Sequence, residues 1–314
     1  DTETAQLFIT GSSSALLSSE IATQFRGRSR AYELLPFSFA EYARANGEPP
    51  EWDGSAAARS RLEALFDAYL VEGGFPGLRG LPAQDRIGVL QDYASLVVVR
   101  DLLDRYDIPD ARGVRDVADA LLAANGTALS VNRLTARLKA RGMAIGRDRV
   151  TAMARHLADA YLLFFVPVFT YSGHKSRVNP QKVYAIDPGL AFAVSAAPSV
   201  NLGQRLEQAV YLELRRRHPL ARERGISYYL TRDRREVDFV VGDRGQGQAA
   251  ALVQVCADLR DAQTRGREIT ALETAMGELG LDQGTIVTLR DSETIKVEAG
   301  TIEAVPAWRW CLEM

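Results

Sequence analysis

The spacing of apolar positions along the chain changes several times, and each change predicts a new element. Residues 59–71 and 83–106 carry apolar side chains three and four positions apart, as amphipathic helices do. The glycine-rich string EGGFPG at residues 72–77 separates these two helices. Upstream, residues 1–45 predict a strand, a helix and then a strand or loop, and the string EPPE at 48–51 forms a break.

The middle of the chain predicts three short helices followed by two strands. The helices are expected at residues 117–124, 131–141 and 149–161, and the strands at 163–171 and 182–186, with a polar loop between the strands. Three helices followed by a β-hairpin is the element order of a winged helix-turn-helix.

The last third predicts a mixed sheet. A helix is expected at residues 203–217, strands at 226–230, 236–241, 250–256, 285–289 and 294–297, and a second helix at 261–279. The chain as a whole is therefore expected to be multidomain, combining α/β and α+β parts.

Composition agrees with this reading. The 314 residues suffice for two to three domains, and 46% hydrophobic residues suffice for real cores. No apolar run approaches the roughly 18 residues of a membrane span, so we expect no membrane partner. The low cysteine content makes a reducing cytoplasm the expected location. Two cysteines and three histidines form neither a disulfide framework nor a zinc site.

Charge is distributed unevenly. Residues 111–182 hold twelve basic and four acidic residues, a balance of +8 in a chain whose net charge is −2. A basic segment within an acidic chain indicates an anionic partner, and double-stranded DNA fits a winged helix. The cations expected to contact its phosphates, with little sequence preference, are Arg147, Arg149 and Arg155 of the third helix and the turn leading into it, and Lys175 and Arg177 of the loop. The alternative is a spacer or protein-docking role, in which these cations only solvate the surface.

Several strings, in their order, resemble a large prokaryotic family of AAA-like P-loop ATPases with a C-terminal domain of unknown function. They are ITGSSS, LLPFSFAEY, YLVEGGFP, VYAIDPGL, YYLTRDRREVDFVV and LVQVCADLRD. The resemblance implies a C-terminal remnant of the P-loop ATPase core at 1–45 and a helical lid at 46–110. It further implies a winged helix-turn-helix at 111–195 and a PD-(D/E)XK nuclease-like (restriction-endonuclease-like) mixed sheet at 196–314.

The resemblance also implies roles in the ATPase remnant. Thr10 or Ser12 would sense the γ-phosphate, and Arg28 would reach a phosphate in cis or from a neighbouring subunit. Alternatively, the serines only cap a helix and Arg28 is a solvated surface residue. No G-x-x-x-x-G-K-[ST] string, the Walker A motif, occurs, and the resemblance implies that this chain starts just after the point where Walker B would end, so both Walker motifs are expected to be missing. The resemblance implies that the intact parent protein, with both motifs, binds ATP and Mg²⁺. This chain lacks the motifs, so it is expected to bind no cofactor.

In the nuclease-like domain, the resemblance makes Glu207 the helix acid and Asp238 the strand acid. Gln254 stands where active members have a glutamate, and Cys256 where they have a lysine. A thiol cannot supply the ammonium and is a poor partner for Mg²⁺, so the site is expected to be disabled.

Two uses of the acids stay open. Glu207 and Asp238 either hold a metal ion or form a polar network, such as an ion pair with Arg234 or Arg235. Cys256 is interpreted as a small core residue.

The leading interpretation is a fragment of an AAA-like ATPase with a DNA-binding winged helix and an inactive nuclease-like domain. One alternative is a non-catalytic module that binds DNA, another protein or a second copy of itself. The other is a Mg²⁺-dependent nuclease with a relocated catalytic lysine.

Overall fold

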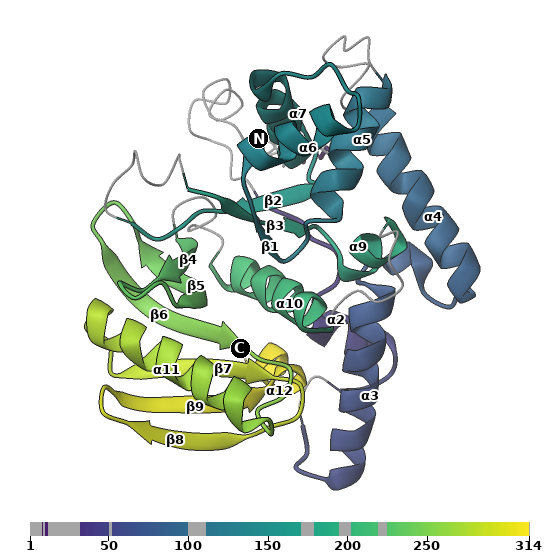
Figure 1. Ribbon diagram of the computed structural model, residues 1–314. Coiled ribbons are helices and arrows are strands. Elements are labelled where there is room, and N and C mark those ends of the chain that lie inside the picture. The colour runs from purple at the N-terminus through teal and green to yellow at the C-terminus, as the bar shows by residue number, and fades with distance from the viewer. Residues whose placement is uncertain are drawn as a thin grey trace, which may run out of the picture.

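Two sheets and the helices packed against them make up the computed structural model (Figure 1). It describes residues 8, 10, 11, 32–49, 52–99, 111–170, 179–194, 202–218 and 225–313. The helices are α2 (Phe39–Ala45), α3 (Ala56–Glu72), η2 (Pro76–Leu78), α4 (Ala83–Leu96), α5 (Ala111–Leu122), α6 (Val131–Ala140), α7 (Arg147–Asp159), α9 (Pro188–Val194), α10 (Leu202–Arg217), α11 (Ala262–Leu279) and α12 (Ala307–Leu312).

The strands alternate with these helices. They are β1 (Thr127–Leu129), β2 (Leu163–Val166), β3 (Gln181–Ala185), β4 (Ile226–Leu230), β5 (Glu236–Asp243), β6 (Gln248–Val255), β7 (Gln283–Thr288), β8 (Glu293–Val297) and β9 (Gly300–Pro306).

Helix α2 begins with a capping box inside the string LLPFSFAEY. The Ser38 backbone N–H donates to Glu41 Oε2 at 2.7 Å, and the Glu41 N–H donates to Ser38 Oγ at 3.2 Å. These bonds satisfy N–H groups that a helix start leaves without partners. The Phe39 ring then meets the Phe66 ring edge-on, with centroids 4.9 Å apart, which packs α2 against α3.

The small sheet has the order β1-β3-β2, with β3 antiparallel to both neighbours. The helices α5, α6 and α7 lie beside it, and their buried apolar residues join its core (Figure 1). The three predicted helices and the two strands after them are confirmed, although the predicted strand at 163–171 ends at Val166. The short strand β1 and helix α9 were not predicted.

The large sheet has the order β4-β5-β6-β7-β9-β8. Strands β6, β7 and β9 run parallel, whereas β4, β5 and β8 pair antiparallel with their neighbours. Because neighbouring strand residues face opposite sides, Leu252 packs in the α11 core and Val253 in the α10 and α12 core. A mixed sheet was expected, but β9 and α12 were not.

The two sheets are joined edge to edge near Tyr228. Its carbonyl accepts from Phe169 N–H at 2.7 Å, and its N–H donates to the Pro167 carbonyl at 3.0 Å. Helix α10 lies between the sheets and shares one apolar core with α2, α3, β3 and α12 (Figure 1). Its side chains therefore reach both sheets.

Candidate functional site

A buried lysine of the small sheet lies among acidic side chains of the large sheet and α10. Lys182 Nζ is 2.7 Å from Glu207 Oε1, 2.8 Å from Asp238 Oδ1 and 2.8 Å from Glu236 Oε1. The two β5 acids are two residues apart, so the strand presents both on one face. Only 2% of the Lys182 side chain is exposed. Three elements, β3, α10 and β5, thus meet around one ammonium group.

Hydrogen bonds fix Asp238 within this cluster. Its Oδ2 accepts from Val255 N–H at 2.9 Å, and its own N–H donates to Gln254 Oε1 at 3.1 Å. The Gln254 amide in turn donates to the Glu268 carboxylate of α11. The buried acid therefore has partners on both oxygens, as a buried charge requires.

Tyr184 positions the other acid. It lies on β3 two residues after Lys182, and its hydroxyl donates to Glu207 Oε1 at 2.5 Å. Glu207 therefore accepts from two side chains of the same strand, which aligns α10 with β3. One helical residue further, the Gln208 amide donates to the Ala185 carbonyl at 2.8 Å and extends this alignment.

Burial sets the protonation of the cluster. It raises the pKa of Glu207 to about 7, an effect that the Asp238 carboxylate increases and Lys182 opposes. Burial alone would lower the pKa of Lys182, but Asp238, Tyr184 and Glu207 hold it well above its ordinary value. Lys182 therefore stays charged, and Glu207 changes protonation near neutral pH.

The sequence residues predicted for the nuclease-like site are only partly brought together. Glu207, Asp238 and Gln254 are connected through the contacts above. Cys256 instead donates from Sγ to the Asp258 carbonyl at 3.2 Å, and burial raises the pKa of its thiol. It packs in the α11 core, so the interpretation as a core residue agrees with its surroundings.

The ion-pair partner expected from the sequence is wrong. Arg235 pairs with Asp233 at 2.5 Å, whereas the acids Glu207 and Asp238 pair with Lys182. Lys182 was missed because it precedes Glu207 in the chain by 25 residues. The period of two in KVYA places Lys182 and Tyr184 on one face of β3, but no local pattern indicates what that face meets.

The Lys182 cluster does not fit a divalent metal ion as it stands. The ammonium group contacts the carboxylate oxygens that a Mg²⁺ ion would need. Within the part of the chain that the structure describes, no group of three or more His, Cys, Asp or Glu residues could hold a metal ion.

The ATPase-remnant residues are placed only in part. Thr10 is exposed and belongs to no helix or strand, while Ser12 and Arg28 lie outside the described residues. Their expected phosphate-sensing roles therefore stay predictions.

The cations predicted to bind DNA lie on the surface where they are described. Arg147, Arg149 and Arg155 of α7 are exposed, and Lys175 and Arg177 lie outside the described residues. From residue 131 to residue 147, five basic residues are exposed and no acidic residue occurs: the five are Arg133, Arg137, Lys139, Arg141 and Arg147. Helix α6 and the start of α7 therefore form a strongly cationic surface.

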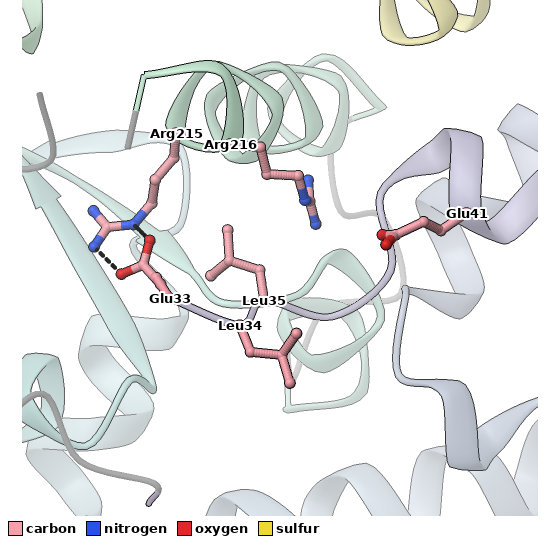
Figure 2. Close-up of a pocket in the computed structure, with 6 residues that line it drawn as sticks. All are labelled: Glu33, Leu34, Leu35, Glu41, Arg215 and Arg216. Atoms are coloured by element: carbon pink, nitrogen blue, oxygen red, sulfur yellow. Dashed lines mark hydrogen bonds and ion pairs between the residues drawn. The ribbon is translucent and has the colours of Figure 1, made fainter. Parts of the chain in front are cut away.

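A small pocket of about 190 Å³ lies where residues 33–35 and Glu41 meet the end of α10 (Figure 2). Arg215 donates from Nε and Nη2 to the two oxygens of Glu33, at 2.9 and 2.7 Å. Arg216 donates to the Pro36 carbonyl at 2.7 Å. Both arginines thus attach the chain segment before α2 to helix α10. The pocket lies where this segment contacts the helix.

Family comparisons divide the chain into three matched segments. Residues 1–43 match an AAA domain, residues 63–201 match a domain of unknown function (DUF8612), and residues 202–310 match a domain of unknown function (DUF4143). No solved structure matches significantly. None of the described helices has the length and apolar character needed to cross a membrane.

Two curated relatives extend the comparison. An uncharacterized protein of Methanocaldococcus jannaschii is 31% identical over 313 residues, covering 98% of this chain and 68% of the relative. An uncharacterized protein of Haemophilus influenzae is 25% identical over 236 residues, covering 74% of this chain and 55% of the relative. With its AAA segment and two domains of unknown function, the chain belongs to the same AAA-like ATPase family as the archaeal protein.

Proposed function

We propose that this chain is the partner-binding part of an AAA-like ATPase. Helices α5–α7 with the small sheet act as a winged helix that binds duplex DNA mainly through its phosphates. The large sheet with α10 and α11 acts as a PD-(D/E)XK nuclease-like domain without cleavage activity. In the whole protein, ATP and Mg²⁺ would supply the energy that these parts pass to the partner.

The observation that best supports DNA binding is the cationic surface of α6 and the start of α7. No acidic residue lies between its five exposed basic residues in the chain, and the first acid, Asp148, follows directly after Arg147. Such a surface favours an anionic partner of high charge density, and phosphates along a duplex provide it. The element order and the sheet order β1-β3-β2 support a winged helix, in which the second and third helices carry the DNA contacts.

The test is retention on duplex DNA at low salt, followed over a salt series. Replacing Arg147, Arg149 and Arg155 by Ala should weaken binding and flatten the salt dependence, because each lost phosphate contact lowers the slope by about 1. The control replaces Arg44, Arg232 and Arg234, which are exposed arginines on other elements.

The control changes net charge by the same amount and should bind nearly as the parent does. If the unmodified chain is not retained at low salt, duplex binding is wrong and a protein-binding role takes its place. If the two triple variants lose affinity equally, the α7 surface is not the contact.

One observation favours the nuclease alternative: Lys182 contacts both Glu207 and Asp238. A relocated lysine is what that alternative requires. However, its side chain is 2% exposed and its ammonium contacts both acids directly, which leaves it no access to a phosphodiester. We expect no plasmid cleavage with Mg²⁺ or Mn²⁺, and cleavage that disappears in Asp238→Asn would overturn this part of the proposal.

A further inference from the structure

The residues that α7 buries fix which of its side chains face outward. The buried set is Val150, Met153, Ala154 and Leu157. A helix turns by about 100° per residue, so the direction opposite to this set passes through Asp148, Ala152 and Arg155, and through Asp159 at the last position of the helix. Asp148 and Arg155 are exposed, and Ala152 between them is small and half-buried.

Arg147 and Arg149 lie on the two flanks of that outward line. The flanking side chains of a helix in the major groove point to the groove walls, where the phosphates lie. The central side chains point to the base edges. Asp148 and Arg155 are seven residues apart, or about 10 Å along the helix, which matches about three base-pair steps.

The chemistry of the central pair selects one kind of base pair. Arginine donates two hydrogen bonds to guanine O6 and N7, and aspartate accepts from the cytosine amino group. Asparagine and glutamine, which read adenine, do not occur in α7, whose sequence is RDRVTAMARHLAD.

An acid at the centre of a cationic surface needs an explanation. Asp148 repels the phosphates that the surrounding arginines attract, so its position lowers affinity for DNA in general. A first-turn acid also favours the helix dipole, and that role predicts an effect on stability alone. Reading cytosine predicts an effect on base preference, so an experiment separates the two roles.

We propose that Asp148 and Arg155 give this surface a preference for G·C base pairs in the major groove of duplex DNA. The inference rests on the proposed duplex binding and goes further by naming the bases and the side chains that read them. Arg147 and Arg149 then hold phosphates and contribute no preference.

The first measurement titrates the unmodified chain into two labelled duplexes of equal length, one rich in G·C and one built of A·T, at the same salt. We expect the G·C duplex to bind about tenfold tighter, within the range of one good base contact. Binding to neither duplex would reject the proposed function itself. Equal binding to both would leave the proposed function standing and reject the base preference.

The second measurement compares Asp148→Asn with the control Asp119→Asn, an exposed acid on α5. Both variants remove one negative charge and should bind all duplexes somewhat more tightly. Only Asp148→Asn should shift the preference toward A·T, because asparagine reads adenine. Arg155→Ala should reduce the G·C preference at unchanged thermal stability. If Asp148→Asn lowers the melting temperature but keeps the preference, Asp148 serves the helix and the proposal is wrong.

Discussion

The Asp187 carboxylate accepts a hydrogen bond from the Gly74 backbone N–H at 2.5 Å, and so ties the end of α3 to the start of α9. Its other oxygen accepts from Leu190 N–H at 3.0 Å, in the first turn of α9. Two strings that lie more than a hundred residues apart, YLVEGGFP and VYAIDPGL, meet at this point. This contact is buried, and Gly73 leaves room for the Asp187 carboxylate because it has no Cβ.

Gly73→Ala should destabilise the protein severely. Gly73 has φ 81° and ψ −175°, a conformation that is nearly restricted to glycine. A Cβ there would lie 2.0 Å from Asp187 Oδ1. We expect a loss of about 3 kcal/mol or more in the free energy of unfolding, measured by urea titration.

The matched control for this change is Gly54→Ala. Gly54 also has φ 81°, but a Cβ there would meet nothing within 4 Å. The control should therefore lose only the conformational part, about 1–2 kcal/mol. Equal losses in the two variants would show that the Asp187 contact does not limit the size of residue 73.

Lys182→Met should destabilise the protein by about 3–5 kcal/mol, because it leaves Glu207 and Asp238 buried without their cation. Adding Glu207→Gln and Asp238→Asn should recover much of that loss, since the neutral amides need no counter-charge. Lys296→Met, on the exposed surface of β8, is the control and should change stability by about 0.5 kcal/mol or less. A triple variant no more stable than Lys182→Met would contradict the role of charge in this cluster.

Stability should fall as the pH rises from about 4.5 to about 7. Burial raises the pKa of Asp187 to about 6 and that of Glu207 to about 7, so the folded state holds these protons more tightly than the unfolded chain does. The stabilisation from these protons is complete when the pH is below the pKa values of the unfolded chain. It is lost as the pH rises through the pKa values of the folded state. Each group contributes a slope of at most about 1.4 kcal/mol per pH unit.

Urea titrations across this pH range check the slope. Asp187→Asn and Glu207→Gln should each flatten it, because neither amide titrates. The control Glu313→Gln removes an exposed acid near the C-terminus and should leave the slope unchanged. A slope that survives both buried substitutions would assign the pH dependence to other groups.

The elements predicted best from the sequence are those whose pattern is long or bounded by clear turns. Strand β4 has its predicted bounds of Ile226–Leu230, and helix α11, expected over residues 261–279, begins one residue later and ends at the same residue. Strand β9 and helix α12 were missed because Pro306 interrupts a short apolar run that fits neither period. The parallel pairing that makes β9 an inner strand, between β7 and β8, is non-local.

The candidate site illustrates the same limit. Its acids Glu207 and Asp238 could be named from the sequence, since Asp238 belongs to the string YYLTRDRREVDFVV and Glu207 to the helix that the family places before it. Their cation could not, because Lys182 comes from another sheet and only the folding of α10 between the sheets brings it there. Spacing along one element predicts which residues share a face, and the fold decides what that face contacts.

The Arg215–Glu33 pair should contribute a measurable coupling energy to stability. It is bidentate, with 11% and 5% of the two side chains exposed, and the guanidinium lies 4.1 Å from the Phe164 ring centroid. Removing either partner leaves the other charge buried, so each single Ala variant should cost about 3–5 kcal/mol. The double variant should cost much less than the sum, with a coupling energy of about 1–3 kcal/mol in a double-mutant cycle.

The control cycle uses Arg309 and Glu313, an i,i+4 pair whose side chains are 43% and 54% exposed, and should give about 0.5 kcal/mol or less. Coupling no larger than in that control pair would mean that the segment before α2 is held on α10 by packing alone, without help from this ion pair.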